Sequence, residues 1–277
     1  MCQLLGMNCN TPTDIVFSFE GFRRRAGLTD CHSDGFGIAF FEGKGVRIFR
    51  DNQPAHSSPI ADCVKQYHIK SLNVIAHIRK ATQGEVNIEN THPFIRELWG
   101  QNWVFAHNGN LKTLPNLKSE NALFHPIGST DSEAAFCYMA SQLKARFKQK
   151  PSEEALFDTI QELTKEIIQG GTFNFILSNG DWMIAHCSTN LHYITREAPF
   201  GIVQRVDDDG VIDFRDYAQK DDKVTIITTF PLTKDEVWTK MEKGGFVLFK
   251  QGKKIAEVLG VKSEAVDDGT LGYQKCS

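Results

Sequence analysis

The 277-residue chain lacks the features that mark several large classes of protein. No stretch approaches the ~18 consecutive apolar residues of a membrane span, and the N-terminus lacks the basic and apolar regions of a signal peptide. Neither sign of charge dominates, because 31 Lys and Arg stand against 34 Asp and Glu. This balance gives no electrostatic reason to expect a nucleic acid or a membrane as partner. We therefore expect a cytoplasmic protein, and we interpret the run Arg23-Arg24-Arg25 as a solvated helix face.

Cysteine and histidine are present without the spacing that stabilises a fold or binds a metal. The seven cysteines are an odd number without a CxxC pair, so neither a disulfide framework nor a zinc knuckle is indicated. His77, His92 and His107 recur every fifteen residues, but zinc sites usually contain a closer pair such as HxxxH. We expect no metal and no cofactor, and we interpret these histidines as structural, hydrogen-bonded to neighbouring loops.

The chain does contain a mixed pattern of helices and paired strands. With 41% hydrophobic and 23% charged residues, it can bury a substantial core. Apolar stripes and caps predict helices at 14–26, from Ser58-Pro59 onward, at 131–148 and 153–169, with a short one after Thr233. Strands, several of them in hairpin pairs, are predicted at 2–7, 36–41, 46–49, 72–78, 103–106, 173–178, 182–187, 191–195, 224–229, 246–249 and 254–258. We expect one domain over 2–258 with two helix layers and two largely antiparallel sheets, followed by a polar tail over 259–277.

The first residue with chemistry to offer is Cys2. Cysteine is small enough to permit removal of Met1, which would place a thiol and a free α-amine on one residue. An α-amine has an unperturbed pKa near ~8. It can therefore act as the base for its own side chain, the N-terminal-nucleophile form of covalent catalysis.

Four further segments hold polar residues where strands are expected to end. Loops at strand ends are where rigid scaffolds usually present functional side chains. The segments are His77-Ile78-Arg79-Lys80-Ala81-Thr82, Asn90-Thr91-His92-Pro93-Phe94, Phe105-Ala106-His107-Asn108-Gly109-Asn110 and Gly128-Ser129-Thr130-Asp131-Ser132-Glu133.

Together with Cys2, these segments resemble the class II glutamine amidotransferases. The order Cys2, HxRxAT, THPF, HNG, TDSE matches that family, and the resemblance extends from residue 2 to about 255. It is closest to the short stand-alone members that lack a synthase domain. The resemblance implies an α+β fold, the four-layer α-β-β-α sandwich of the N-terminal-nucleophile hydrolases.

The resemblance also implies a mechanism for these residues. The Cys2 thiol, deprotonated through its own α-amine, would attack the γ-carboxamide of glutamine. The Asn108 side-chain amide and the Gly109 main-chain N–H would receive the resulting oxyanion. Ammonia would leave, and water would hydrolyse the γ-glutamyl thioester to glutamate. No cofactor takes part in this scheme.

Three more residues are expected to bind the amino-acid end of the substrate. Arg79 is suited to hold the α-carboxylate as a planar bidentate fork, which lysine would not reproduce. Thr82 could add a hydroxyl to that carboxylate, and Asp131 would pair with the α-ammonium. Asp131 could instead favour the positive end of its helix, but the capping pair Thr130 and Glu133 leaves it free to face a ligand.

Asn108-Gly109 also has a simpler interpretation, because the dipeptide is typical of a type I′ turn. The preceding His107 and the order of the motifs favour the oxyanion role. The chain also departs from better-known members of the family, with Cys31-His32 in place of an Arg-Gly pair before Asp34. Lys80 stands where aromatic residues are common, which leaves open how the substrate loop closes.

Three functions follow from these patterns. The leading hypothesis is a glutaminase-type hydrolase, and any transfer of ammonia would require a separate synthase subunit as partner. A second hypothesis is hydrolysis of a larger γ-glutamyl amide or peptide, for which the same nucleophile and amino-acid clamp would serve. The third is a catalytically silent domain that senses a ligand.

Overall fold

Two antiparallel sheets form the centre of the computed structural model, which describes residues 2–81, 84–114 and 122–260. One sheet runs in the order β13 (Thr239–Lys240), β9 (His192–Arg196), β12 (Val224–Thr228), β1 (Gln3–Asp14), β4 (Lys70–Ile78), β2 (Phe36–Glu42) and β3 (Gly45–Asp51). The other runs β15 (Lys253–Val258), β14 (Phe246–Lys250), β8 (Met183–His186), β7 (Gly171–Ser178), β6 (Gln101–Leu111) and β5 (Phe94–Leu98). A small separate sheet pairs β10 (Ile202–Gln204) with β11 (Val211–Asp213).

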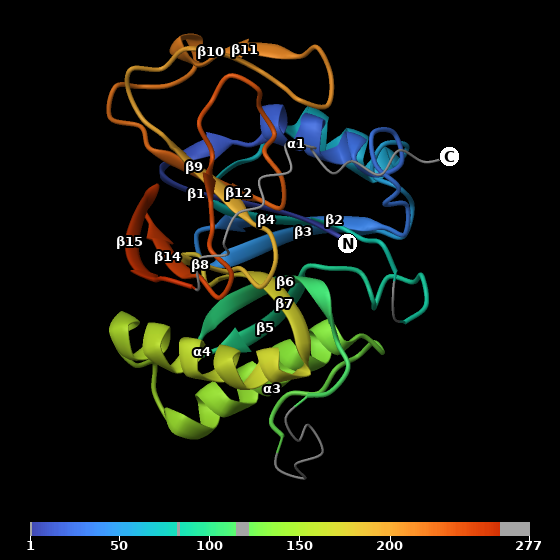
Figure 1. Cartoon of the computed structure of the whole chain (residues 1–277), viewed down its shortest axis with the longest axis vertical. Helices are drawn as coiled ribbons and strands as arrows, with labels where there is room; N and C mark the ends of the chain where they lie inside the picture. The colour runs from blue at the N-terminus through green and yellow to red at the C-terminus, as the bar shows by residue number, and fades with distance from the viewer. Residues whose placement is uncertain (1, 82–83, 115–121, 261–277) are drawn as a thin grey trace.

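Helices cover the outer face of each large sheet (Figure 1). The helices are α1 (Val16–Arg24), α2 (Pro59–Tyr67), α3 (Asp131–Arg146) and α4 (Glu153–Ile167), with 3-10 turns η1 (Ile168–Gly170) and η2 (Phe214–Asp216). Three buried clusters separate the layers: α1 and α2 against the first sheet, α3 and α4 against the second, and one between the sheets. The predicted α-β-β-α sandwich is therefore confirmed.

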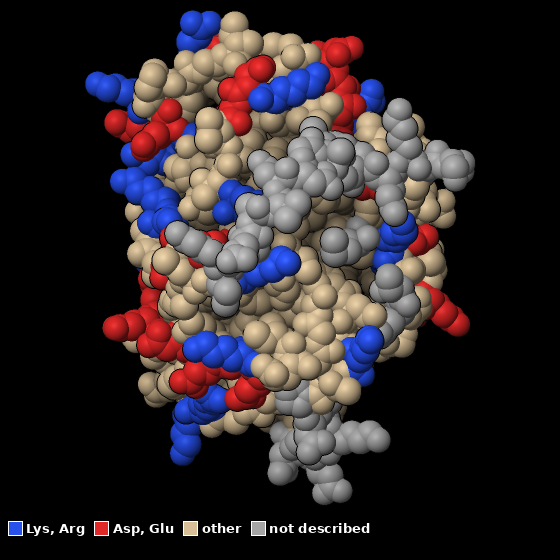
Figure 2. All heavy atoms as spheres, in the orientation of Figure 1, with Lys and Arg blue, Asp and Glu red and all other residues tan. Residues whose placement is uncertain are grey.

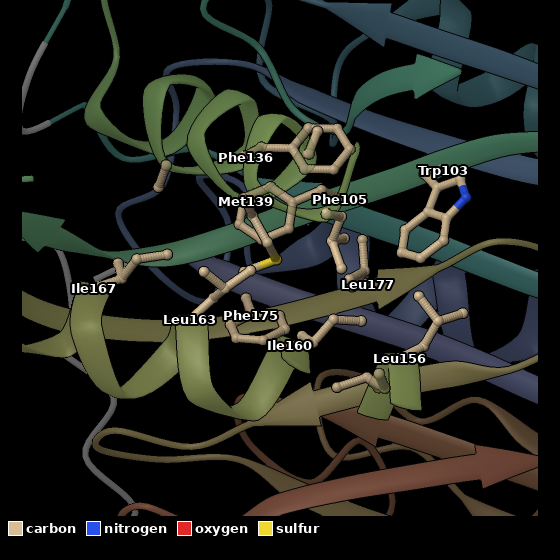
Figure 3. Close-up of a cluster of buried hydrophobic side chains, with 14 of the residues drawn as sticks. Trp103, Phe105, Phe136, Met139, Leu156, Ile160, Leu163, Ile167, Phe175 and Leu177 are labelled. Atoms are coloured by element: carbon tan, nitrogen blue, oxygen red, sulfur yellow. The ribbon is translucent and has the colours of Figure 1, made fainter. Parts of the chain in front are cut away.

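The helix starts and stripes follow from local sequence. The Ser58 Oγ accepts hydrogen bonds from the N–H groups of Ile60 and Ala61 at the start of α2, which is the expected N-cap. The apolar stripe of α4 is buried and faces the second sheet, where Figure 3 shows it near Phe175 and Leu177. The stripe consists of Leu156, Ile160, Leu163 and Ile167. Burying each such side chain stabilises the fold by about 1.5–3 kcal/mol.

The segment after Thr233 differs from its prediction, because it forms no helix and leads into β13. The Thr233 hydroxyl donates to the Glu236 carboxylate and accepts from the Trp238 indole N–H. Glu236 in turn forms a bidentate ion pair with Arg196 of β9, at 2.6 and 2.7 Å. These side-chain contacts anchor the segment to the sheet edge in place of a helical turn.

The arginine run also differs from its prediction. Arg25 is fully buried, and its guanidinium pairs with Asp207 and donates to the main-chain oxygens of Phe230 and Pro231. It therefore joins the end of α1 to the segment between β10 and β11. These two short strands were not predicted from the sequence. No helix in the described ranges is long and apolar enough to cross a membrane. Most of the predicted tail lies outside the described residues, so the domain bounds stay a prediction.

Candidate active site

Cys2 lies at the head of β1, a central strand of the seven-stranded sheet. In the neighbouring strand β4, Ile78 pairs with Gln3, so the chain leaving β4 passes beside Cys2. The Cys2 Sγ is 3.2 Å from the N–H of Lys80, from which it accepts, and 3.3 Å from the carbonyl oxygen of Lys80. Burial raises the pKa of the thiol, opposed by the Lys80 N–H and the positive charge of Arg79. The thiol is therefore protonated at neutral pH and needs a base to become a nucleophile.

Asn108 reaches Cys2 from the other sheet. Its Nδ2 donates a 2.5 Å hydrogen bond to the main-chain oxygen of Cys2. The residue is 1% exposed, and its Oδ1 is buried without a partner in the described chain. The turn interpretation of Asn108-Gly109 is wrong, because both residues lie inside β6, opposite Asn174 and Phe173 of β7.

Gly109 is required by the close approach of β7. A Cβ at this position would lie 1.9 Å from the main-chain oxygen of Thr172, which no side chain could tolerate. Phe173, which lies opposite Gly109, uses its main-chain groups on the far side of β7: its N–H donates to Ser188 Oγ and its oxygen accepts from His186. Because an antiparallel strand alternates the direction of these groups, the Gly109 N–H points away from β7. The partner strand on that side, β5, ends its pairing at Phe105.

Arg79 follows directly after β4 and is 3% exposed. Its guanidinium donates to the main-chain oxygens of Gly84 at 3.2 Å and Glu85 at 2.8 Å. Burial lowers the pKa of the guanidinium, opposed by Cys2 and Asp34, but an arginine stays charged in proteins. A buried cation therefore lies next to the thiol.

Asp34 holds the Arg79 segment in place, a role that the sequence analysis missed. Its Oδ2 accepts from the N–H of Ala81 at 2.7 Å, and its own N–H donates to the oxygen of Arg79. Just before it, His32 is buried and lies 3.2 Å from the carboxylate of Asp30. The loop that departs from the family pattern is thus joined through Asp34 to the chain that follows β4.

Asp131 is the first residue of α3, and Thr130 is its N-cap. The Asp131 Oδ2 accepts from the N–H of Leu111 at 2.7 Å, and Oδ1 accepts from the N–H of Ser132. The carboxylate is therefore tied to the end of β6, the strand that carries Asn108. Oδ1 also accepts from the Ser132 Oγ at 3.4 Å, whereas Oδ2 keeps a second lone pair for a ligand. Thr82, also predicted to bind substrate, and Met1 lie outside the described residues.

The predicted capping pair is only half formed. The Thr130 Oγ1 accepts from the Glu133 N–H. The buried Glu133 carboxylate instead pairs with Arg96 at 2.6 Å and accepts from the Gly128 N–H. It therefore anchors the loop before α3 to β5.

The three histidines have different surroundings. His107 is buried, with Nε2 3.0 Å from the Thr172 oxygen and Nδ1 2.8 Å from Ser132 Oγ. This residue is hydrogen-bonded as predicted, but its partners lie in helix α3 and strand β7 and not in loops. The prediction is wrong for His92, whose ring nitrogens have no hydrogen-bond partner among the described residues. The rings of His77 and His92 lie 4.1 Å apart, centre to centre, and are tilted by 37° to each other. Burial lowers the pKa of His77 to about 3, so this ring is neutral. Within the described ranges, no three His, Cys, Asp or Glu side chains form a candidate metal site.

Charges of both signs are interspersed over the face of the molecule in Figure 2, outside the grey atoms, in keeping with the net charge of −3. The site itself is defined by contacts between the two sheets. A cysteine at the head of a central strand faces an asparagine amide across an α-β-β-α sandwich. This is the architecture of the N-terminal-nucleophile hydrolases.

Comparison with known proteins identifies the family. The chain matches the model of the class-II glutamine amidotransferases over residues 1–268. A Haemophilus influenzae protein named "Putative glutamine amidotransferase" is 78% identical over 272 residues, which cover 98% of this chain and 92% of that protein. The Escherichia coli protein "Putative glutamine amidotransferase YafJ" is 51% identical over 256 residues, 92% of this chain and all of that protein. The chain therefore belongs to the class II glutamine amidotransferase family.

Solved structures agree with this assignment. The crystal structure of a predicted glutamine amidotransferase from Pseudomonas aeruginosa has a TM-score of 0.72 at 40% identity and covers 92% of this chain and 100% of that one. The glutamine phosphoribosylpyrophosphate amidotransferase of B. subtilis has a TM-score of 0.58 at 16% identity and covers 93% of this chain but 49% of that one. The second likeness shows the shared fold alone.

Proposed function

We propose that the protein hydrolyses glutamine to glutamate and ammonia, with Cys2 as the N-terminal nucleophile after removal of Met1. The observation that carries the proposal is the position of the Asn108 amide, 2.5 Å from the main-chain oxygen of Cys2. A hydrogen-bond donor thus lies beside the residue that would attack the substrate. Family membership supports glutamine as the substrate.

The α-amine of the processed Cys2 is the base. Burial raises the pKa of the thiol, so a thiolate does not form without a proton acceptor at hand. An α-amine with a pKa near ~8 is partly unprotonated at neutral pH. It takes the Sγ proton as Sγ bonds to the amide carbon of the substrate, and the carbonyl electron pair moves to oxygen. The proton then passes to the amide nitrogen, and the bond between carbon and nitrogen breaks to release ammonia. The γ-glutamyl thioester that remains on Cys2 is hydrolysed by water.

The oxyanion is bound by two donors on β6. An asparagine amide has two N–H donors, and one of them binds the Cys2 oxygen. The second N–H of Asn108 and the main-chain N–H of Gly109 receive the oxyanion. A positioned donor of this kind contributes about 10²–10³ in rate.

Arg79, Thr82 and Asp131 bind the amino-acid end of the substrate. The α-carboxylate takes the place of the Gly84 and Glu85 carbonyls as acceptor for the buried guanidinium, because a charged acceptor forms the stronger hydrogen bond. Asp131 accepts from the α-ammonium through the second lone pair of Oδ2, and the Thr82 hydroxyl donates to the carboxylate. Any transfer of the released ammonia to an acceptor would require a separate synthase subunit as partner.

The test is release of glutamate and ammonia by protein whose intact mass confirms removal of Met1. We expect Cys2→Ala to abolish release and Cys63→Ala, a change at an exposed cysteine, to leave it unchanged. Glutamate release that survives Cys2→Ala would contradict the proposal. A higher kcat/KM for γ-glutamyl dipeptides than for glutamine would favour the larger substrate. Binding of glutamine by calorimetry without turnover would favour a sensing domain.

A further inference from the structure

Asn174 of β7 has a fully buried side chain that contacts the strand carrying the proposed oxyanion donors. It lies directly opposite Asn108 in the β6–β7 ladder. Its Nδ2 donates to the main-chain oxygen of Asn108 at 2.9 Å and to Thr189 Oγ1 at 2.8 Å. Its Oδ1 accepts from the N–H groups of Ser188 at 2.9 Å and Thr189 at 3.0 Å. Two donors and two acceptors are thus all engaged, which fixes the orientation of the amide.

The hydrogen bond from Asn174 to the Asn108 oxygen affects the orientation of the whole peptide group between Asn108 and Gly109. The oxygen of Asn108 and the N–H of Gly109 belong to the same planar peptide and point in opposite directions. The main-chain ladder with β7 also holds that oxygen, and the Asn174 amide adds a second donor that restrains the plane and therefore the direction of the Gly109 N–H. This N–H points out of the β6–β7 ladder, where the proposed oxyanion forms. Asn174 is placed to aim it without touching substrate.

The same network continues to the strand of the nucleophile. The loop that Asn174 holds contains Asn190, whose Nδ2 donates to the oxygen of Thr229 at 2.7 Å. The Thr229 Oγ1 accepts from the N–H of Leu4 at 2.9 Å, and the Thr229 N–H donates to the oxygen of Leu4. Leu4 is two residues from Cys2 on β1. Hydrogen bonds, joined by the backbone of the 188–190 loop, therefore connect the oxyanion strand of one sheet to the nucleophile strand of the other.

We propose that Asn174 is a positioning residue, which orients the Asn108–Gly109 peptide and fixes it relative to Cys2 through the 188–190 loop and Thr229. This inference rests on the proposed function, because it assigns Asn174 to the same reaction. Packing between the sheets holds them together in any case. The distinct role of Asn174 is to set the angle between the oxyanion donors and the Cys2 thiol.

The test compares Asn174→Ala and Asn174→Asp with Asn73→Ala. Asn73 is a matched control, because it is 1% exposed and its Nδ2 likewise donates to a main-chain oxygen, that of Gly180. We expect both Asn174 variants to lower kcat for glutamine about 10- to 100-fold with KM within about twofold, since mis-aimed donors lose part of their 10²–10³ contribution. Asn73→Ala should lower thermal stability similarly and leave kcat unchanged. A kcat for Asn174→Ala equal to that of Asn73→Ala would overturn the inference.

A second readout separates this inference from the proposed function. If the wild-type protein does not hydrolyse glutamine, the proposed function fails, and crystal structures of the two alanine variants still decide the role of Asn174. We expect the Asn108–Gly109 peptide to rotate, and the contact between the Asn108 amide and the Cys2 oxygen to lengthen, in Asn174→Ala alone. An unchanged peptide in that variant would overturn the inference whatever the activity.

Discussion

The side-chain amide of Asn108 lies 2.5 Å from the main-chain oxygen of Cys2, although the two residues are 106 positions apart in the chain. They belong to different sheets, so the contact forms only when the sheets pack face to face. Nucleophile and oxyanion donor are therefore positioned by the same packing that forms the core between the sheets. The predictions below depend on this coupling of fold and chemistry.

Removing the Asn108 donor should slow the chemical step. We expect Asn108→Ala to lower kcat for glutamine by about 10²–10³, the usual contribution of one oxyanion donor, with little change in KM. The matched control is Asn102→Ala on the same strand, whose partly exposed side chain donates to the Lys44 oxygen, and it should leave kcat unchanged. Steady-state kinetics of the two variants checks this, and equal kcat values would argue against an oxyanion role.

Replacing Arg79 by lysine should weaken substrate binding. Lysine keeps the charge but loses the planar fork that binds a carboxylate through two parallel hydrogen bonds. Losing a charged hydrogen bond costs about 1.5–3 kcal/mol, so we expect KM for glutamine to rise about 10- to 100-fold. Arg50→Lys, at a half-buried arginine that donates to the Thr91 oxygen, is the control. An unchanged KM in Arg79→Lys would remove this residue from the carboxylate site.

Adding one methyl group at Gly109 should impair both stability and activity. The new Cβ would lie 1.9 Å from the Thr172 oxygen, so β6 and β7 must separate, at a cost of about 1–3 kcal/mol. That movement displaces Asn108 as well, and we expect kcat to fall together with the melting temperature. Gly201→Ala, where a Cβ meets nothing within 4 Å, should change neither. Calorimetry and kinetics on both variants check the pair of effects.

The buried histidines should make stability depend on pH. Burial holds the pKa of His77 at about 3 and that of His186 at about 4, below the unfolded value near ~6.5. At a pH between the folded and the unfolded pKa, the unfolded chain binds more protons than the folded chain. The free energy of unfolding is therefore fully present above about pH 6.5 and falls as the pH drops toward 3. Each histidine adds a slope of up to about 1.4 kcal/mol per pH unit.

Urea unfolding at several pH values measures this slope. His77→Gln or His186→Gln should each reduce it. A slope that stays the same in both buried variants would show that other groups account for the acid sensitivity.

Local patterns were enough to predict the helices that cover the two sheets. The serine at position 58 predicted the start of α2 because an N-cap acts within three residues. The stripe of α4 predicted a helix because its period matches one buried face. By contrast, β5 contains Arg96 and Glu97 among its five residues and shows no apolar alternation. Its strand conformation depends on pairing with β6, which the local sequence does not reveal.

Long-range partners explain the rest of what the sequence left open. Arg25 is buried because Asp207, 182 positions away, neutralises it, and no local pattern contains that information. Asp34 and Asn174 were missed for the same reason. Asn174 did leave a signal, since it is an amide inside the apolar strand Phe173–Ser178, where a buried polar group needs hydrogen-bond partners.

The most direct test of the central claim is the intact mass of the protein before and after incubation with a glutamine-like diazoketone, an electrophile that alkylates a nucleophilic thiol held in a glutamine-binding pocket. The account predicts loss of Met1 and a single adduct that maps to Cys2, is prevented by excess glutamine and is absent in Cys2→Ala. A processed chain that takes up no adduct, or one labelled at the exposed Cys63 instead, would contradict it.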